Sequence, residues 1–376
     1  MINRDNLLLF IIFIIFGGSA VIQLFYYAYF YLAPELIRKI QIPSVFAPVS
    51  IIICARNEEK NLRNFLPAIL EQDYPDFEVI VVNDCSEDNS YSVLGELIPR
   101  YPNLRISDIS KDPKFTHNKK FAQFIGIKAA KNEILLFTDA DCRPESDKWV
   151  ESMVSHFNDK TEFVLGYGGY GVNKGLLNKY IRYDSMTIAI QYIGMAIRGI
   201  PYMGVGRNLA YRRSVFFETK GFGSHAHLVS GDDDLFVNKY ADKGNTAVEF
   251  RKESHTRSVP PGSFQELFRQ KRRHLTTAHH YKLRDIIILI TEPATRTLFY
   301  LSLVIAISNL FLWQYVIAVF TIRLIMQIIV LTLAKKRFNE PGLLIYSLFF
   351  DIFSPFLNLV FYSGIYRQSH SRSKWK

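Results

Sequence analysis

The sequence predicts a doubly wound α/β domain flanked by transmembrane helices. Three observations support this fold class. Apolar β-branched runs alternate with segments of helical spacing within residues 43–285, charge-poor apolar blocks lie on both sides of that region, and 49% of the chain is hydrophobic with 14% aromatic. This composition is rich for a protein that faces water on all sides, and 376 residues can hold a catalytic domain as well as membrane segments.

The first apolar block lies near the start of the chain. Residues 7–32, LLLFIIFIIFGGSAVIQLFYYAYFYL, contain no charged side chain and are long enough to cross a hydrocarbon core of about 30 Å with some tilt. A secretory signal peptide has a shorter apolar core and a small-residue cleavage site, neither of which is visible here. We therefore expect residues 1–35 to be a retained transmembrane anchor.

Two further apolar blocks predict a C-terminal membrane region over residues 286–376. Residues 294–334 are interrupted only by Arg296 and Arg323, and their length suits two spans joined by a very tight hairpin. Residues 343–366 are less clear because they contain an aspartate, Asp351, and a proline, Pro355. A polar residue at such a depth usually faces protein or a water-filled cavity. We favour a re-entrant segment broken at Pro355 over a fourth full span.

Basic residues beside the apolar blocks predict the orientation. Arg38 and Lys39 follow the first block, and residues 335–337, Lys-Lys-Arg, follow the second. Short cytoplasmic loops carry an excess of lysine and arginine. We therefore expect a multi-pass protein of the cell membrane whose catalytic domain lies in the cytoplasm.

The net charge of +10 is also compatible with a nucleic-acid-binding protein. The basic residues, however, cluster beside the membrane segments and do not alternate with aromatic residues along a single-strand platform, so anionic lipid headgroups explain them more simply. We expect no nucleic-acid partner. The three cysteines, Cys54, Cys85 and Cys142, have no metal-ligand spacing and suit reduced thiols with a structural role.

The region 43–285 begins with alternating strands and helices, as a parallel sheet requires. The strand segments are continuous β-branched runs, typical of strands that are buried on both faces. The expected strands are 49–55, 77–84, 104–107 and 133–139. The expected helices are 57–72, 86–101 and 119–130.

Polar segments follow three of these strands. ARNEE follows the first, NDCSEDNS the second, and DADCRP the strand that ends with Thr138. Each alone is equally compatible with a turn or a helix cap. Because ligands of doubly wound sheets bind beyond the carboxyl ends of the strands, we expect all three segments to converge on one cleft.

Asp139 and Asp141 are the most informative pair among these residues. Two carboxylates one residue apart repel each other at a strand end unless a divalent cation compensates them. Mg²⁺ and Mn²⁺ typically bind one or two carboxylates together with substrate phosphates. The pair therefore predicts Mg²⁺ or Mn²⁺ and a phosphate-bearing ligand.

With these motifs the chain resembles the family 2 glycosyltransferases, whose nucleotide-sugar-binding fold is called GT-A. The resemblance covers about residues 48–274. It depends on an ordered series of motifs: VSIIICARNEEKNL, FEVIVVNDCSEDNS, the paired lysines of HNKKFAQFIGI, TDAD, GVGRNLAYRRSVFFETKGF, GDDDLF and RQKRRH. It implies an inverting hexosyltransferase that uses a nucleotide-diphosphate sugar, with a UDP-sugar as the first expectation.

The resemblance also implies which residues bind the donor. The carboxylates after the first two strands would hold the base and ribose, one of the paired lysines would approach the diphosphate, and Asp141 would be the more direct metal ligand of the DXD element. Asn83 replaces one of the family's paired acids, which leaves room for altered base contacts. The nucleotide-sugar residues implied are Ala55, Glu58, Asp84, Lys119, Lys120 and Asp139, and the metal residues are Asp139 and Asp141.

The catalytic residues implied by the resemblance lie in two later motifs. In SGDDDLFVNKY the family's acidic dyad aligns with Asp232 and Asp233, and the second member would deprotonate the acceptor hydroxyl. The alternative is that these acids cap a helix N-terminus. In FRQKRRHL, Gln270 and Arg273 match the family, and Arg273 can neutralise charge on the leaving diphosphate. A basic stripe on lipid headgroups is the alternative for this segment.

A departure from the family pattern bears on the product. His274 stands where processive members have a tryptophan that grips the growing chain. We therefore expect transfer of one sugar or very few, with a processive polysaccharide synthase as the alternative. Residues 176–201 have scattered charges and an apolar face, so we interpret them as a helix at the membrane surface beside the cleft, or else as an ordinary buried helix.

A membrane-surface helix would favour a lipid or lipid-linked acceptor, such as a polyprenyl phosphate, a lipid-linked sugar or a glycerolipid. Two alternatives belong to other classes. A haloacid-dehalogenase-type phosphatase expects threonine or valine where Arg143 stands, and does not predict GDDDLF. A non-catalytic membrane binding protein would have lost the acids, which this chain retains.

Overall fold

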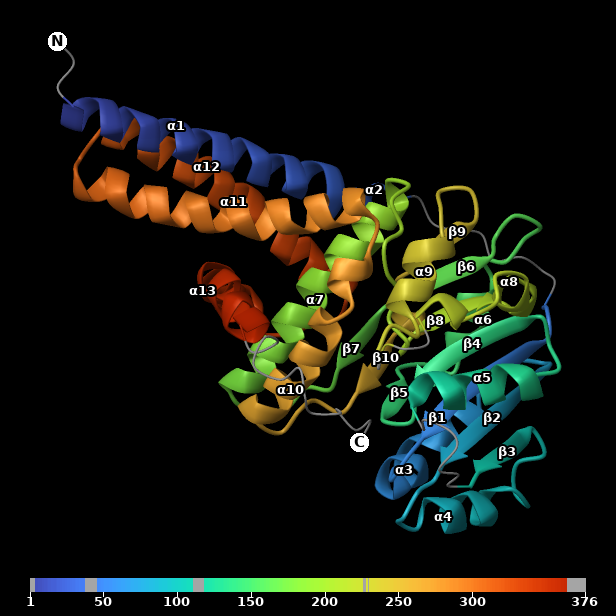
Figure 1. Ribbon diagram of the computed structural model, residues 1–376. Helices are drawn as coiled ribbons and strands as arrows, with labels where there is room; N and C mark the ends of the chain where they lie inside the picture. Colours follow the sequence, from blue (N-terminus) through green and yellow to red (C-terminus); the bar gives the residue numbers. More distant parts are fainter. Residues whose placement is uncertain (1–3, 38–45, 111–117, 226–227, 229, 364–376) are drawn as a thin grey trace.

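The computed structural model describes residues 4–37, 46–110, 118–225, 228 and 230–363. A seven-stranded mixed sheet forms the centre of the α/β part (Figure 1), in the order β3-β2-β1-β4-β8-β6-β9. The parallel strands are β1 Val49–Ala55, β2 Phe77–Asp84, β3 Leu104–Ile109 and β4 Ile134–Asp139. The other strands are β6 Phe163–Gly166, β8 Leu209–Arg212 and β9 Thr246–Glu249, with β8 antiparallel to both β4 and β6.

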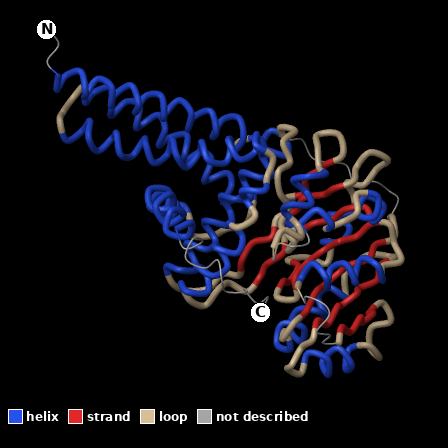
Figure 2. Tube along the Cα trace, viewed as in Figure 1, coloured by secondary structure: helices blue, strands red, loops and turns tan. Residues whose placement is uncertain are grey.

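The predicted doubly wound arrangement is confirmed. All four expected strands are present, and helices lie between them in the chain as expected: α3 Glu59–Leu70, α4 Ser90–Leu97 and α5 Lys119–Ala129. Figure 2 shows these helices on the two faces of the sheet. The continuous β-branched runs are explained by burial, because every residue of β1 is buried.

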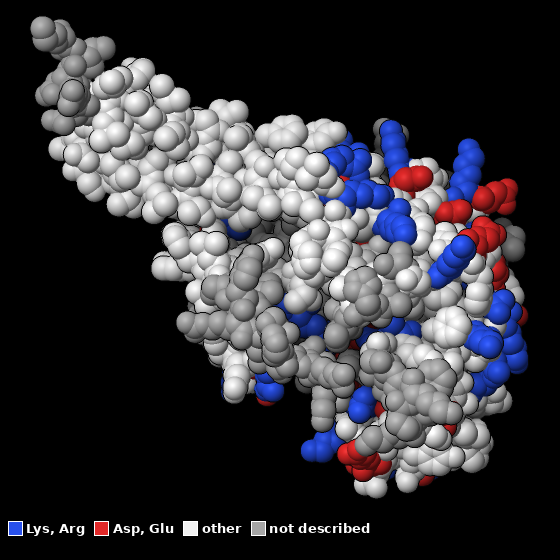
Figure 3. All heavy atoms as spheres, in the orientation of Figure 1, with Lys and Arg blue, Asp and Glu red and all other residues white. Residues whose placement is uncertain are grey.

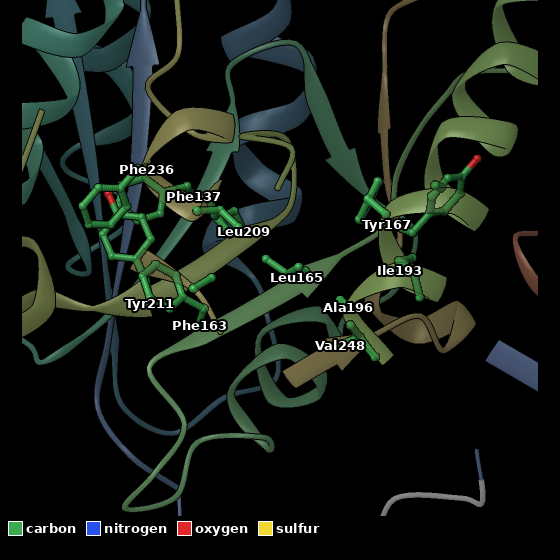
Figure 4. Close-up of a cluster of buried hydrophobic side chains, with 14 of the residues drawn as sticks. Phe137, Phe163, Leu165, Tyr167, Ile193, Ala196, Leu209, Tyr211, Phe236 and Val248 are labelled. Atoms are coloured by element: carbon green, nitrogen blue, oxygen red, sulfur yellow. The ribbon is translucent and has the colours of Figure 1, made fainter. Parts of the chain in front are cut away.

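Two apolar layers enclose the sheet. Ile51 and Ile53 of β1 pack with the layer that contains Leu62 and Leu66 of α3, whereas Ile52 of β1 packs in the opposite layer. This alternation is the two-residue period of a strand. The second layer is rich in aromatic rings: Figure 4 shows Phe137, Phe163, Tyr211 and Phe236 together, and the centroids of Phe137 and Tyr211 are 4.5 Å apart.

A smaller three-stranded sheet follows the carboxyl end of strand β4 of the main sheet. Its order is β5-β10-β7, with β10 antiparallel to β5 and parallel to β7. The strands are β5 Cys142–Pro144, β7 Gly168–Tyr170 and β10 Thr256–Ser258. The remaining helices of this part are α6 Trp149–Val154, α7 Leu176–Ile197, α8 Arg213–Glu218, α9 Asp234–Tyr240 and α10 Phe264–Leu275.

Within the described residues, four helices are long and apolar enough to cross a membrane, one near the N-terminus and three near the C-terminus. They are α1 Arg4–Phe25, which continues as the π-helix η1 Tyr26–Tyr31, and α11 Leu283–Ser308, α12 Trp313–Arg337 and α13 Leu344–Ser363. Figure 1 shows α1, α11 and α12 extending together away from the sheet. Figure 3 shows a largely uncharged surface on the visible face of this bundle, as a lipid-facing surface requires.

The C-terminal helices differ in two ways from expectation. The hairpin is confirmed, but α11 begins at Leu283, before the apolar block, because Asp285 and Glu292 are buried within packed helices. The break predicted at Pro355 is wrong, because α13 continues through it. Proline removes one backbone hydrogen bond, and the packing of α13 against α7, α10, α11 and α12 holds the helix across that gap.

Asp351 of α13 faces protein, as expected for a polar residue at that depth. Its carboxylate accepts hydrogen bonds from Arg296 (2.9 Å), Arg323 (3.0 Å) and Tyr300 (2.7 Å). These partners belong to α11 and α12, so one buried carboxylate joins three of the candidate membrane helices. Breaking such a pair would leave an uncompensated buried charge.

The interpretation of residues 176–201 as a membrane-surface helix is wrong. Most residues of α7 are buried, because this helix packs against the short helix α2 Ala33–Leu36 and against η1, α13, β7 and β9. A Cβ at Gly194 would lie only 2.1 Å from the carbonyl oxygen of Phe30, so glycine permits the close approach of α7 to η1. The alternative of an ordinary buried helix therefore holds.

Candidate functional site

The three polar segments lie at the carboxyl edge of the main sheet. Strand β1 lies between β2 and β4, and its last residues pair with theirs: Ala55 with Asn83, and Cys54 with Asp139. Parallel pairing in register therefore brings the ends of all three strands together. This edge is where a doubly wound sheet binds its ligands.

The ends of β1 and β2 hold the acidic residues predicted to contact the nucleotide. Asp84 is fully buried, and its Oδ2 lies 3.8 Å from Nη1 of Arg56. Glu58 is also buried, and its Oε2 accepts a hydrogen bond from Asn61. Asp84 is the last residue of β2, and Glu58 lies in the segment that follows β1, so both carboxylates are at the edge of the sheet where a ligand would bind.

Asn83 has a structural reason to be an amide. Its Nδ2 donates a hydrogen bond of 2.6 Å to Oδ1 of Asp108, at the end of the neighbouring strand β3. A carboxylate at this position would face Asp108 at the same distance and repel it. The departure from the family's paired acids is therefore compensated locally by an acid on β3.

The end of β4 brings two carboxylates and a thiol together. A carboxylate oxygen of Asp139, one of Asp141 and the Sγ of Cys142 all lie within 4.8 Å of one another. Oδ2 of Asp141 accepts a hydrogen bond of 2.9 Å from Ser258 of β10, and its backbone carbonyl accepts one of 3.1 Å from the N–H of Val259. Two carboxylates in this arrangement fit the preference of Mg²⁺ and Mn²⁺ for hard oxygen ligands.

Lys119 lies among the acids of two motifs. Its Nζ is 2.9 Å from Oδ1 of Asp139 and 3.2 Å from Oδ2 of Asp232. Burial alone would lower the pKa of Lys119, but Asp139, Asp232 and Asp233 outweigh it and hold this pKa well above its usual value. Burial would likewise raise the pKa of Asp139, but Lys119 reverses the effect and lowers it. The lysine thus stays charged and joins TDAD to GDDD.

Lys120 hydrogen-bonds to backbone carbonyl groups and forms no ion pair of the kind that joins Lys119 to Asp139 and Asp232 within the described residues. Its side chain is 4% exposed, and its Nζ donates hydrogen bonds to the carbonyl oxygens of His225 (2.7 Å) and Leu228 (3.0 Å). Burial lowers its pKa to about 8. Of the two lysines expected near the diphosphate, the structure places Lys119 at the cluster and gives Lys120 backbone partners in the segment before GDDD.

Asp233 combines a capping role with an altered pKa. It is the N-cap of α9, and its Oδ1 accepts a 3.0 Å hydrogen bond from the N–H of Asp234, as the capping alternative expected. The N–H of Gly206 donates to its Oδ2. Burial, followed by the charge of Asp232, raises the pKa of Asp233 to about 7, although Lys119 acts in the opposite direction. A carboxyl with this pKa can accept a proton near neutral pH.

The two neighbours of Asp233 have different surroundings. Asp232 is buried and forms the ion pair with Lys119. Asp234 is also buried, and its Oδ2 accepts hydrogen bonds from Thr277 and Tyr281, the latter at 2.8 Å. These hydrogen bonds link α9 to the segment before α11, so the carboxylate of Asp234 has a structural role.

Helix α10 carries the other predicted catalytic residues, Gln270 and Arg273. Gln270 hydrogen-bonds to Tyr170 of β7, and the guanidinium of Arg207 stacks over the same tyrosine, 4.3 Å from the ring centroid. Burial and Lys119 have the largest effects on the pKa of Asp139. Arg207 and Arg273 have the next largest effects, and both lower this pKa. Positive charge from two further elements therefore reaches the carboxylate cluster.

Sequence reasoning missed three residues of this site: Gly206, Arg207 and Ser258. Gly206 and Arg207 lie in GVGRN, a segment that carried the family resemblance without an assigned role. A Cβ at Gly206 would lie 2.8 Å from Oδ2 of Asp233 and 3.2 Å from Nζ of Lys119, so only glycine leaves both side chains in place. Ser258 lies in a short strand without a recognisable motif.

Comparisons with known proteins agree with this geometry. Residues 50–218 match the model of the family described as Glycosyl transferase family 2. Glycosyltransferase AglE of Haloferax volcanii is 29% identical over 206 residues, which are 52% of this chain and 62% of AglE. The UDP-Glc:alpha-D-GlcNAc-diphosphoundecaprenol beta-1,3-glucosyltransferase WfaP of Escherichia coli is 24% identical over 174 residues, which are 41% of this chain and 65% of WfaP. The chain thus spans less than two thirds of the length of each relative.

A solved structure supports the fold across nearly the whole chain. The mannosyltransferase PcManGT of Pyrobaculum calidifontis, solved in complex with GDP-Man and Mn²⁺, has a TM-score of 0.56 and 16% sequence identity. The likeness covers 90% of this chain and 99% of PcManGT. The likeness shows a GT-A fold for this chain, and the match to the family described as Glycosyl transferase family 2 covers strands β1, β2 and β4, which build the site.

Proposed function

We propose that this protein is an inverting glycosyltransferase that moves a sugar from a nucleotide-diphosphate sugar, with a UDP-sugar as the first choice, to a hydroxyl of a membrane lipid or lipid-linked acceptor. The observation that carries the proposal is Asp233. Its carboxyl has a pKa of about 7 and lies in one charged cluster with Lys119, which in turn contacts Asp139 of the DXD element.

The donor would occupy the carboxyl edge of the sheet. Glu58 and Asp84, with the backbone of Ala55 beside them, would hold the base and ribose. Lys119 and Arg273 would face the diphosphate, and Arg207 is a further cation close to the same acids. In this account Asp139 and Asp141 hold Mg²⁺ or Mn²⁺, which when bound would neutralise the charge of the diphosphate.

Asp233 would act as the general base. Its carboxylate accepts the proton of the acceptor hydroxyl while that oxygen forms a bond to the anomeric carbon. The bond from this carbon to the diphosphate oxygen breaks, and the nucleoside diphosphate leaves with the electron pair. Attack from the side opposite to the leaving group inverts the anomeric configuration. A base with a pKa near the working pH suits this step.

The requirement for a base favours a hydroxyl acceptor. A phosphate group is already ionised near neutral pH, whereas a hydroxyl must lose its proton as it attacks. WfaP, by its name, transfers glucose to a diphosphoundecaprenol-linked sugar. Such an acceptor presents a hydroxyl close to the membrane, and the four candidate membrane helices support a lipid-linked molecule of this class here.

We also propose that the α/β part lies in the cytoplasm. The basic end of α12, residues 335–337, adjoins the α/β part: Arg337 forms an ion pair of 2.8 Å with Glu35 and lies over the ring of Phe250. Figure 3 shows lysine and arginine side chains gathered where the bundle meets the α/β part. Basic residues at that end support a cytoplasmic location.

An assay of the purified protein in detergent tests this proposal. The protein is incubated with a panel of nucleotide sugars, Mn²⁺ or Mg²⁺ and a membrane lipid extract, and the released nucleotide identifies the donor. Mass analysis of the lipids then identifies the glycosylated acceptor. Absence of nucleotide release from every donor in the presence of lipids, or release of phosphate from simple phosphomonoesters instead, would overturn the proposal.

A further inference from the structure

The loop between α12 and α13, residues 338–343, inserts into the α/β part. Its acidic residue, Glu340, is fully buried. Oε1 of Glu340 accepts a hydrogen bond of 2.7 Å from the hydroxyl of Tyr167, and Oε2 accepts one of 2.7 Å from Nε of Arg182 on α7. Nη1 of Arg257 donates to Oε1 as well. A buried carboxylate is tolerated when it has partners of this kind, and here all three come from the α/β part.

Arg257 fastens the same loop through its backbone. Nη2 of Arg257 donates to the carbonyl oxygens of Phe338 (2.8 Å) and Asn339 (3.0 Å). The guanidinium fits closely beside β7, because a Cβ at Gly169 would lie only 2.3 Å from Nη1 of Arg257. Glu340 and its loop therefore hold the side chain of Arg257 on one side, while Oε2 of Glu145 lies 3.1 Å from its Nη2.

The residue after Arg257 contacts the proposed metal site. Ser258 donates to Oδ2 of Asp141 at 2.9 Å, and the N–H of Val259 donates to the Asp141 carbonyl at 3.1 Å. Arg257 and Ser258 are consecutive in β10, and successive side chains of a strand point to opposite faces. One side of this short strand thus bonds to Glu340, and the other side bonds to Asp141.

We propose that Glu340 is a positioning residue for Asp141. It holds β10 through Arg257, and β10 holds Asp141 through Ser258, so the packing of the α12–α13 loop determines the orientation of this carboxylate. The inference rests on the proposed function, in which Asp141 binds the metal ion. Glu340 itself contacts neither the donor nor the ion.

The test measures Mn²⁺ binding to the full-length protein in detergent, for example from the electron paramagnetic resonance signal of free Mn²⁺. Glu340→Gln keeps the size of the side chain and removes its charge. Changes beside a metal ligand typically weaken metal binding by about 10- to 100-fold, so we expect at least roughly a tenfold loss. We expect a loss of Mn²⁺ affinity of the same order for Ser258→Ala. Because both residues act through β10, the variant that combines Glu340→Gln with Ser258→Ala should lose less affinity than the product of the two single losses.

A matched control separates positioning from general destabilisation. Glu249 is also a buried glutamate with two basic side chains beside it, His156 at 2.8 Å and Arg251 at 2.6 Å, neither of which belongs to β10. Glu249→Gln should lower the thermal unfolding midpoint about as much as Glu340→Gln while leaving Mn²⁺ affinity unchanged. If Glu340→Gln does not fold, Arg257→Lys takes its place with the same expected loss.

Three results would overturn the inference. The first is a folded Glu340→Gln variant, or Arg257→Lys in its place, that binds Mn²⁺ within threefold of the affinity of the unmodified protein. The second is a loss of Mn²⁺ affinity no larger than that of Glu249→Gln. The third is a double variant whose loss of Mn²⁺ affinity equals the product of the two single losses. Asp141→Asn separates this failure from failure of the proposed function. If Asp141→Asn binds Mn²⁺ as tightly as the unmodified protein, the metal assignment itself is wrong. If Asp141→Asn loses Mn²⁺ binding while Glu340→Gln, or Arg257→Lys in its place, does not, only the positioning role of Glu340 is wrong.

Discussion

The backbone N–H of Gly206 donates a hydrogen bond to the carboxylate of Asp233. This contact stabilises the ionised form of a side chain whose burial favours the neutral form, so it works against the rise in the pKa of Asp233. It also brings the GVGRN segment against GDDD, with Lys119 beside both. Under the proposed function, this one contact orients the base and tunes its pKa.

Gly206→Ala should therefore damage transfer without unfolding the protein. The added Cβ would lie 2.8 Å from Oδ2 of Asp233 and 3.2 Å from Nζ of Lys119, and both side chains would have to move. Because small displacements of catalytic groups are costly, we expect a loss of roughly 10²-fold in the transfer rate. Gly95→Ala is the control, since nothing lies within 4 Å of a Cβ there. Similar rates for both variants would remove Gly206 from the site.

The pH dependence of transfer should report the titration of Asp233. A base must be deprotonated to accept a proton, and the pKa of this carboxyl is raised to about 7. The single-turnover rate should therefore rise by about tenfold for each pH unit as long as the pH is below the pKa. Above a pH of about 7 the rate should level off. A rate that is flat between roughly pH 5.5 and 8.5, with donor binding unchanged, contradicts the assignment.

Asn83→Asp should destabilise the protein, although it restores the family's paired acids. The new carboxylate would face Asp108 at the 2.6 Å now occupied by a hydrogen bond. We expect the free energy of unfolding to fall by about 1–3 kcal/mol, the usual cost of an unpaired buried polar group. Asn83→Asp combined with Asp108→Asn should recover most of the loss, because donor and acceptor are exchanged. If the double variant is no more stable than Asn83→Asp, the local compensation does not exist.

Product size should be independent of the ratio of donor to acceptor. His274 stands in α10 where processive members of the family have tryptophan, so the site lacks that grip on a growing chain. Mass analysis of early and late products should find one added sugar or very few at every ratio. Long polymers at early times would favour a polysaccharide synthase.

Local sequence patterns were sufficient to predict the main features of the fold and part of the site. The strands that end at Ala55, Asp84 and Asp139 are continuous apolar runs, and their parallel order places the polar residues after them at one edge. The hairpin of α11 and α12 followed from length and composition alone. These features depend on residues that are close together in the chain.

The missed features depend on contacts between distant residues. Adjacent helix positions point in different directions, so only the packed structure could distinguish Lys119, beside Asp139, from Lys120, beside His225. An apolar helix face looks the same whether lipid or protein covers it, so the sequence could not decide between a membrane-surface helix and a buried helix for α7, which the structure shows to be buried. The bonds from Glu340 to Arg182 and Arg257 link segments that no local pattern connects.

Under the proposed function, Asp233 is the base and Asp141 serves the metal ion and the donor. The most direct test compares donor affinity, by calorimetry with Mn²⁺ present, with the single-turnover transfer rate of each variant. Asp233→Asn should keep donor affinity while transfer falls by roughly 10²- to 10⁴-fold, because the amide cannot accept a proton. Asp141→Asn should reduce both, because the ion acts on the diphosphate before and during the reaction. Transfer by Asp233→Asn within about tenfold of the unmodified protein, with a larger loss in Asp232→Asn or Asp234→Asn, would contradict the account and assign the base to that neighbour.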